Sequence, residues 1–68
     1  MTNTPLLVEY IDKSGYKRSY IAKCMGLNTY TLAMKINNES EFWASEIDSL
    51  CELLNIDIEA RMAIFFAK

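Results

Sequence analysis

The side chains most able to do chemistry in this chain are cations gathered in one stretch of the sequence. Residues 13–38 contain no Asp or Glu, and their five positive side chains are Lys13, Lys17, Arg18, Lys23 and Lys35. The whole chain nevertheless has a net charge of −2, because residues 1–12 contribute −2 and residues 39–68 contribute −5. Since phosphate attraction is local, a basic segment on an acidic chain favours a nucleic acid as the partner.

Catalytic and metal-binding chemistry has little support in these residue types. The chain has no histidine, no glycine-rich phosphate-binding loop, and neither Cys24 nor Cys51 has C-x-x-C spacing or a base partner. We therefore expect no enzyme, no metal and no cofactor. Both cysteines are predicted to be free thiols, with a structural disulfide as the alternative. For Cys24 a redox-sensing role is the alternative to simple partial exposure.

Length and composition indicate one helical domain that spans residues 1–68. Half of the chain is apolar (51%), and it has only two glycines and one proline, which is typical of a folded helical protein. No apolar run approaches the roughly 20 residues of a membrane span, and the N-terminus lacks a leader pattern. The chain is expected to be cytoplasmic, without a membrane partner.

Five helical pieces can be placed from periodicity and capping residues. The first is predicted at residues 4–14, with Thr4 as its cap, Pro5 in the first turn, and Gly15 as its left-handed end. The next two are predicted at residues 18–25 and 29–37, the latter capped by Asn28. The last two occupy residues 44–54 and a stretch that begins near residue 58. Residues 62–67 could be helix or strand.

The spacing of small and apolar residues between 21 and 36 is typical of a helix-turn-helix. Ala22 allows two helices to cross closely, Gly26 allows a tight turn, and Leu32 and Ile36 lock the second helix onto the rest of the domain. Leu7, Ile11, Ile47 and Leu50 are expected in the same core, with Cys51 as a small buried residue. Phe42 and Trp43 are predicted to cover one end of that core.

Residues 15–28 and 31–38 resemble the helix-turn-helix of lambda-repressor-like proteins, the group of phage repressors and Cro proteins. The similarity continues through the pattern of residues 45–54, and the closing Ile64, Phe65 and Phe66 are similar to the apolar ending of small phage and prophage regulators in that group. The resemblance implies a compact, all-α, five-helix lambda-repressor-like domain. It also implies a transcriptional regulator that binds a double-stranded DNA operator as a homodimer and inserts residues 29–37 into the major groove.

Three positions depart from the pattern of that group. Lys17 stands in place of the usual cap of the second helix, Asn38 stands where a glycine commonly follows the recognition helix, and Trp43 occupies a position often filled by a capping Thr. An uncapped second helix would leave its first amides free for an anion such as a phosphate. We expect the local geometry to differ at these points.

The resemblance also carries specific roles onto residues of this chain. The predicted contacts to DNA bases are Thr29, Tyr30 and Met34. The predicted contacts to the DNA backbone are Lys17, Arg18, Ser19, Asn28 and Asn37. Simple solvent exposure is the alternative for each of them, and Lys13 and Lys23 are expected to be only solvated.

Two questions stay open at this stage. Phe65 and Phe66 could form a dimer contact, or they could fold back to complete the core of one chain. The acidic half of the chain could also bind another protein, in which case the domain would be a protein-interaction module such as an antirepressor or accessory factor. The operator sequence, and whether the protein represses or activates, are not encoded in any pattern that we recognise.

Overall fold

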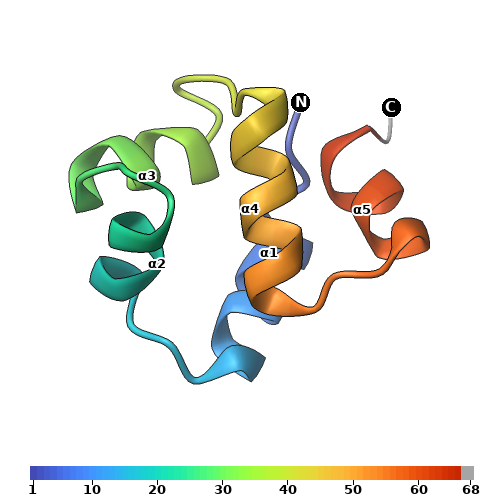
Figure 1. The fold of residues 1–68 in the computed structure, drawn as a ribbon. Helices are drawn as coiled ribbons and strands as arrows, with labels where there is room; N and C mark the ends of the chain where they lie inside the picture. The colour runs from blue at the N-terminus through green and yellow to red at the C-terminus, as the bar shows by residue number, and fades with distance from the viewer. Residues whose placement is uncertain (67–68) are drawn as a thin grey trace.

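A computed structural model of the chain describes residues 1–66 and contains five helices and no strand in that range (Figure 1). The helices are α1 (Thr4–Ser14), α2 (Arg18–Cys24), α3 (Thr29–Ile36), α4 (Ala44–Leu54) and α5 (Ile58–Phe65). The expected all-α class with five helices is therefore confirmed. No helix in the described range is long and apolar enough to cross a membrane.

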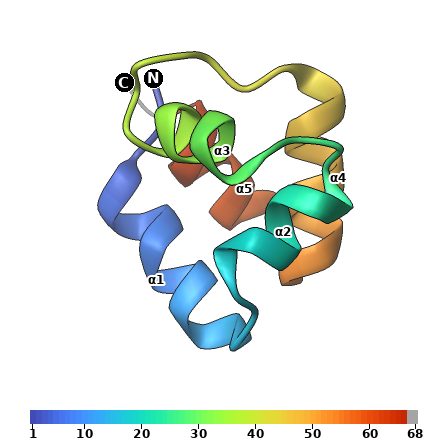
Figure 2. The same cartoon turned by 90° about the vertical axis from the view of Figure 1, so that its left-hand side faces the viewer.

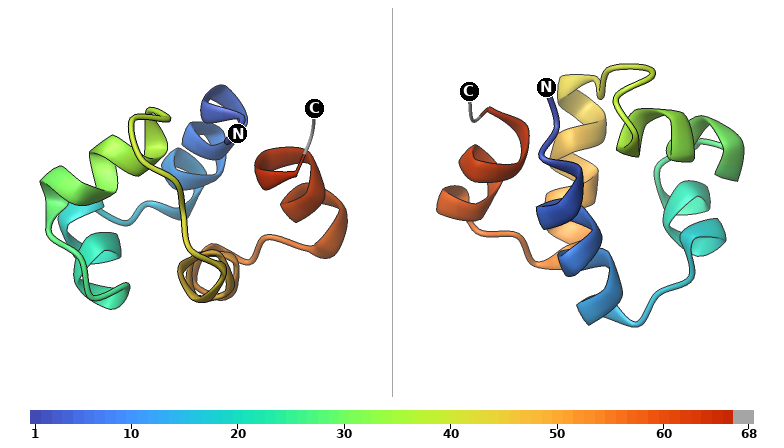
Figure 3. Two further views of the ribbon diagram at one scale, coloured as in Figure 1. Left: turned by 90° about the horizontal axis from the view of Figure 1, so that it is seen from above. Right: turned by 180° about the vertical axis from the view of Figure 1, so that it is seen from behind.

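The five helices are arranged with α1 and α4 in the middle. The pair α2 and α3 lies on one side of them and α5 on the other, as the front view and the view from above agree (Figures 1 and 3). Direct packing joins α2 to α3 and α4, and joins α1 to α4 and α5. Turning the molecule brings α2 and α3 to the viewer (Figure 2), so that these two helices together form one face.

The cap of α1 is one residue earlier than predicted. Asn3 is the capping residue, because its Oδ1 accepts a hydrogen bond from the Leu6 N–H at 3.2 Å. Thr4 is already helical, and its hydroxyl donates instead to the carbonyl of Ile36 at the end of α3. At the other end of α1 the prediction is confirmed, since Gly15 has a φ of 74°.

The connection between α2 and α3 is a tight turn at a glycine. Gly26 has a φ of 73°, a left-handed conformation that side chains other than glycine rarely adopt. The Leu27 N–H then donates to the Ala22 carbonyl at 2.8 Å, and Asn28 Oδ1 caps α3 by accepting from the Thr31 N–H at 2.7 Å. The capping role predicted for Asn28 is confirmed. Both helices end one residue earlier than predicted, at Cys24 and Ile36.

One hydrophobic core lies between the helices and contains the predicted apolar positions. Its buried members are Leu7, Ile11, Ile21, Ala22, Leu32, Ile36, Ile47, Leu50, Cys51, Leu54, Ile56, Ile64 and Phe65. Both cysteines are free thiols, Cys51 buried and Cys24 exposed. Phe42 packs against this core as predicted, but the placement of Trp43 over the core is wrong. Trp43 is 70% exposed, because it is the capping residue of α4 and its side chain projects outside that helix.

The C-terminal stretch is helical where the sequence left helix and strand open. Asp57 caps α5 by accepting from the Ala60 N–H at 2.8 Å, and the helix continues to Phe65. Phe65 is 6% exposed and meets Phe42 edge to face at 5.5 Å between ring centroids, whereas Phe66 is 54% exposed. In the single chain Phe65 therefore belongs to the core and Phe66 does not. Residue 67 of the predicted tail lies outside the described residues.

The N-terminal residues tie α3 and α5 together. The Asn38 side chain accepts from the Thr2 N–H at 2.8 Å and donates to the Thr2 carbonyl at 2.9 Å. The Asn3 N–H donates to the carbonyl of Ile64 at 2.7 Å. Asn38 has a φ of 64°, so its backbone has the conformation of a glycine while its side chain supplies hydrogen bonds that glycine lacks.

Candidate functional site

The outward face of α3 carries the three residues predicted to contact bases. Thr29 is exposed, Tyr30 is 74% exposed, and Met34 is half-buried. They are held outward because Leu32 and Ile36, on the opposite side of the helix, are buried. Neither α2 nor α3 contains an acidic residue. The face therefore combines a hydroxyl, a phenol and a thioether, without a carboxylate that would repel phosphate.

The residues predicted to contact the DNA backbone are also on the surface, at the ends of α2 and α3. They are Lys17, Arg18, Ser19, Asn28 and Asn37, and all five are exposed. Lys17 is the capping residue of α2 but makes no capping hydrogen bond, as predicted. Asn28 and Asn37 stand at the start and the end of α3, so these two residues flank Tyr30 along the helix.

The basic stretch provides less free charge than its sequence indicates. Lys35 is only 5% exposed, and its Nζ lies 2.8 Å from Glu46 Oε1, so this lysine is an internal cation. Lys35 therefore belongs to the basic stretch in the sequence but adds nothing to its charge at the surface. Lys13 is exposed but pairs with Glu9 at 3.4 Å, one turn away on α1. The three remaining cations, Lys17, Arg18 and Lys23, form no ion pair with any residue that the structure describes.

Lys35 directly follows Met34 of the candidate face, but its contacts with residues 41–46 were not predicted from the sequence. Lys35 Nζ also donates to the Glu41 carbonyl at 2.9 Å and lies 5.2 Å from the centre of the Trp43 ring. Nothing in the local pattern could reveal it, since Lys35 and Glu46 are eleven residues apart and on different helices. The one available signal was that Lys35 adjoins Ile36 on the buried side of the predicted helix.

A small aromatic cluster lies at the start of α2. The rings of Tyr16 and Tyr20 are 5.1 Å apart between centroids, and both residues are exposed. The Cys24 thiol, one turn along α2 from Tyr20, raises the pKa of the Tyr20 phenol through a hydrogen bond and its charge. The two tyrosines add polar and aromatic surface next to Lys17 and Arg18 in the chain.

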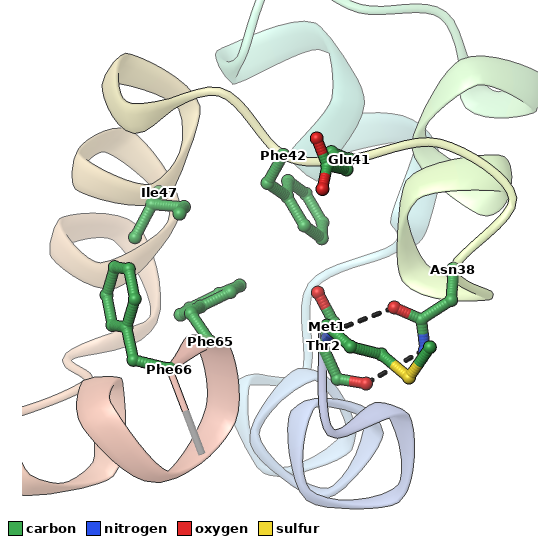
Figure 4. Close-up of a pocket in the computed structure, with 8 residues that line it drawn as sticks. All are labelled: Met1, Thr2, Asn38, Glu41, Phe42, Ile47, Phe65 and Phe66. Carbon is green, nitrogen blue, oxygen red and sulfur yellow. Dashed lines mark hydrogen bonds between the residues drawn. The ribbon is translucent and has the colours of Figure 1, made fainter. Parts of the chain in front are cut away.

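A separate depression, which Tyr30 does not line, lies between the N-terminal residues, the loop after α3 and the end of α5. It has a volume of about 210 Å³ and is lined by Met1, Thr2, Asn38, Glu41, Phe42, Ile47, Phe65 and Phe66 (Figure 4). The aromatic rings and Ile47 form one wall, and the hydrogen-bonded pair of Thr2 and Asn38 forms another. The depression is apolar in the middle and holds the exposed ring of Phe66 at its edge.

Comparisons with known proteins find no relative: no family model, no curated protein and no solved structure matches this chain. Within residues 1–66 no group of three or more potential metal ligands comes together.

Proposed function

We propose that this chain is a sequence-specific DNA-binding transcriptional regulator of the lambda-repressor-like, helix-turn-helix class, similar to phage repressors and Cro proteins. One observation carries the proposal. The exposed face of α3 bears Tyr30 and Thr29, and α3, which has no acid, packs against α2. The start of α2 carries Lys17 and Arg18, which form no ion pair with any described residue. A short helix that presents such a face beside a tight glycine turn has the form needed to enter a major groove.

In this proposal the surface residues divide into two groups by chemistry. Thr29, Tyr30 and Met34 read base edges, through a hydroxyl, a phenol and apolar contact with thymine methyl groups. Lys17, Arg18, Ser19, Asn28 and Asn37 contact phosphates and set the register of the protein on the duplex. Because only Lys17 and Arg18 in this second group are cations, each bound copy should release few counterions.

The proposal includes a homodimer, at least on DNA. A single recognition helix reads only a few base pairs, and two copies about 34 Å apart are the usual route to useful specificity. Phe66 is the aromatic residue of the C-terminal pair that remains exposed, at 54%. Ile58 and Met62 on α5 are also exposed, and Phe66, the residue that follows α5, continues their four-residue spacing, which supports α5 as the contact surface.

The test is a selection of bound sequences from a pool of random duplex DNA with the purified protein. We expect a preferred, partly palindromic sequence to emerge. Its affinity should fall with salt at a log–log slope of roughly −2 per bound copy, set by the two cations among the proposed phosphate contacts, Lys17 and Arg18. A pool that gains no preferred sequence, together with binding that is insensitive to salt, would contradict the proposal.

The second candidate is a protein-interaction module on the same fold, and one surface favours it. Trp43 and Phe66 are exposed aromatic residues, and Phe66 borders the depression beside Phe42 and Ile47. Exposed aromatic side chains near a hollow are typical of protein contacts. Salt dependence separates the two functions, because an apolar contact loses little affinity between low and high salt.

A further inference from the structure

Lys35 is the one charged residue of α3, and its ammonium group is buried among other groups of the protein. The ammonium group makes two hydrogen bonds, to the Glu41 carbonyl at 2.9 Å and to Glu46 Oε1 at 2.8 Å. It also lies over the Trp43 ring at 5.2 Å. All three partners belong to residues 41–46, which form the end of the loop after α3 and the first turn of α4.

Glu46 connects this cation to the start of α4. The same Oε1 that receives the Lys35 ammonium also accepts a hydrogen bond from the Trp43 N–H at 2.8 Å. A carboxylate at this third helical position satisfies a free amide and interacts favourably with the positive end of the helix. The last turn of α3 and the first turn of α4 are therefore joined through one buried oxygen atom.

The contribution of this pair to net stability should be small. Glu46 is also buried, at 8% exposure, so both ions lose their hydration on folding. For buried ion pairs this desolvation offsets most of the attraction, and replacement by neutral side chains of similar volume is often harmless. The pair differs from apolar packing in being directional, because hydrogen bonds fix the positions of their partners.

Direction matters for α3 because apolar contact alone sets the angle of a helix less sharply than hydrogen bonds do. Leu32 and Ile36 are buried by apolar contact. The Thr4 hydroxyl donates to the Ile36 carbonyl at the end of the helix, whereas Lys35 is the side chain of α3 that makes directional contacts with α4. Lys35 precedes Ile36 and projects about 100° further around the helix, so it fixes the rotation of α3 about its own axis. Base recognition needs side chains placed within about 0.5 Å, and a small rotation would move Tyr30 and Met34 by more than that.

We propose that Lys35 and Glu46 form a positioning clamp that sets the orientation of α3 on α4 and thereby determines sequence discrimination, with little effect on general affinity for DNA. This inference rests on the proposed function. Lys35 and Glu46 are positioning residues here, since both are buried and neither can reach a base.

The test is the double variant Lys35→Met with Glu46→Gln, which removes both charges and leaves neither ion buried alone. The amide oxygen of Gln can still accept from the Trp43 N–H. We expect a melting temperature close to that of the wild type and an unchanged salt slope on random duplex DNA. Discrimination between the selected sequence and a scrambled one should fall by about tenfold. A control pair, Lys13→Met with Glu9→Gln, removes the exposed ion pair of α1 and should leave discrimination intact.

The other possible outcomes also decide for or against the clamp or the proposed function. Unchanged discrimination in the double variant, with a wild type that selects its sequence, overturns the clamp and leaves the proposed function standing. A wild type that selects no sequence overturns the proposed function, and the clamp with it. If the double variant does not fold, Lys35→Leu with Glu46→Leu gives the same comparison, because it replaces both buried ions by apolar side chains and also removes the Lys35 hydrogen bonds. Full discrimination in that variant also overturns the clamp.

Discussion

At the scale of single residues, burial and ion pairing determine which positive side chains of the basic stretch are free to contact a partner. Lys35 is enclosed by Glu41, Glu46 and Trp43, and Lys13 is paired with Glu9. Arg18, at the start of α2, is exposed and has no ionic partner among the described residues. Of these three positive residues, Arg18 is therefore a better candidate for phosphate contact than Lys13 or Lys35.

The first prediction concerns Arg18. Replacing it by Ala should weaken binding to every DNA sequence alike and reduce the salt slope by about 1, because one phosphate contact is lost. Lys13→Ala is the matched control and should leave the slope unchanged, since Lys13 already has a partner in Glu9. Titrations at several salt concentrations measure both. An unchanged slope for folded Arg18→Ala would place the DNA face elsewhere.

The second prediction concerns Tyr30, which we expect to contact a base. Tyr30→Ala should cost about 1–3 kcal/mol on the preferred sequence and relax the preference at about one or two base pairs. The melting temperature should not change, because the side chain is 74% exposed. Selection with the variant protein measures the relaxed positions. A uniform loss of affinity over all sequences would instead assign Tyr30 to a phosphate.

The third prediction follows from the buried thiol of Cys51. Burial raises the pKa of Cys51 in the folded chain, and a thiol of the unfolded chain has a pKa of about 8.5. Above that pH the unfolded chain binds fewer protons than the folded one, so stability falls as pH rises. Melting temperatures between pH 7 and pH 10 should therefore fall more steeply for the wild type than for Cys51→Ala. Parallel curves would mean that Cys51 ionises freely in the folded protein.

At the scale of helices, the close contact of α2 and α3 depends on the size of one side chain. Ala22 is 1% exposed and accepts the Leu27 N–H through its carbonyl, at the point where the chain turns back. The turn itself needs Gly26, whose φ of 73° strains any larger residue. These two small residues set the distance and the direction of α3 relative to α2.

The fourth prediction tests that contact. Ala22→Leu should destabilise the fold by about 1–3 kcal/mol, since the added atoms have no space between the helices. For a chain of this size that loss corresponds to a decrease of the melting temperature of about 4–8 °C per kcal/mol. Ala63→Leu adds the same atoms at an exposed position of α5 and serves as the control. Equal melting temperatures for both variants would show that α2 and α3 are not close at Ala22.

The helices were the most predictable part of this structure, and long-range polar contacts the least. The range of α4 and the capping roles of Asn28 and Asp57 follow from local patterns, because capping and periodicity involve residues a few positions apart. The burial of Lys35 and the exposure of Trp43 depend on how the loop after α3 meets α4, which no local pattern encodes. The exposed residues of the candidate site followed from the burial of Leu32 and Ile36 on the opposite side of α3.

At the scale of the whole molecule, charge is distributed unevenly over the surface. Among the described residues, the cations without an ion pair belong to α2 and to the residue before it, whereas exposed acids are found on α1, in the loop after α3, on α4 and on α5. The two helices without an acid are α2 and α3. Under the proposed function, this distribution favours an encounter in which α2 and α3 reach the DNA first.

The fifth prediction separates the two C-terminal phenylalanines. Phe66→Ser should leave a folded monomer with weaker self-association and weaker, less cooperative operator binding, because the ring is exposed on α5. Phe65→Ser should instead lower the melting temperature strongly, because it removes a buried ring that packs on Phe42. Sedimentation equilibrium and thermal melts distinguish these effects. Unaltered association of Phe66→Ser would place the dimer surface away from this ring.

The hydrogen bond from Asn3 to Ile64 joins residues near the two ends of the chain. Closing so long a loop costs more entropy than forming the turn between Ala22 and Leu27, so this contact forms late during folding. Ile64 of α5 is fully buried in the folded structure, so the core is complete only once α5 has docked on α1. Helices α1 to α4 can therefore assemble first, and the docking of α5 then completes the core.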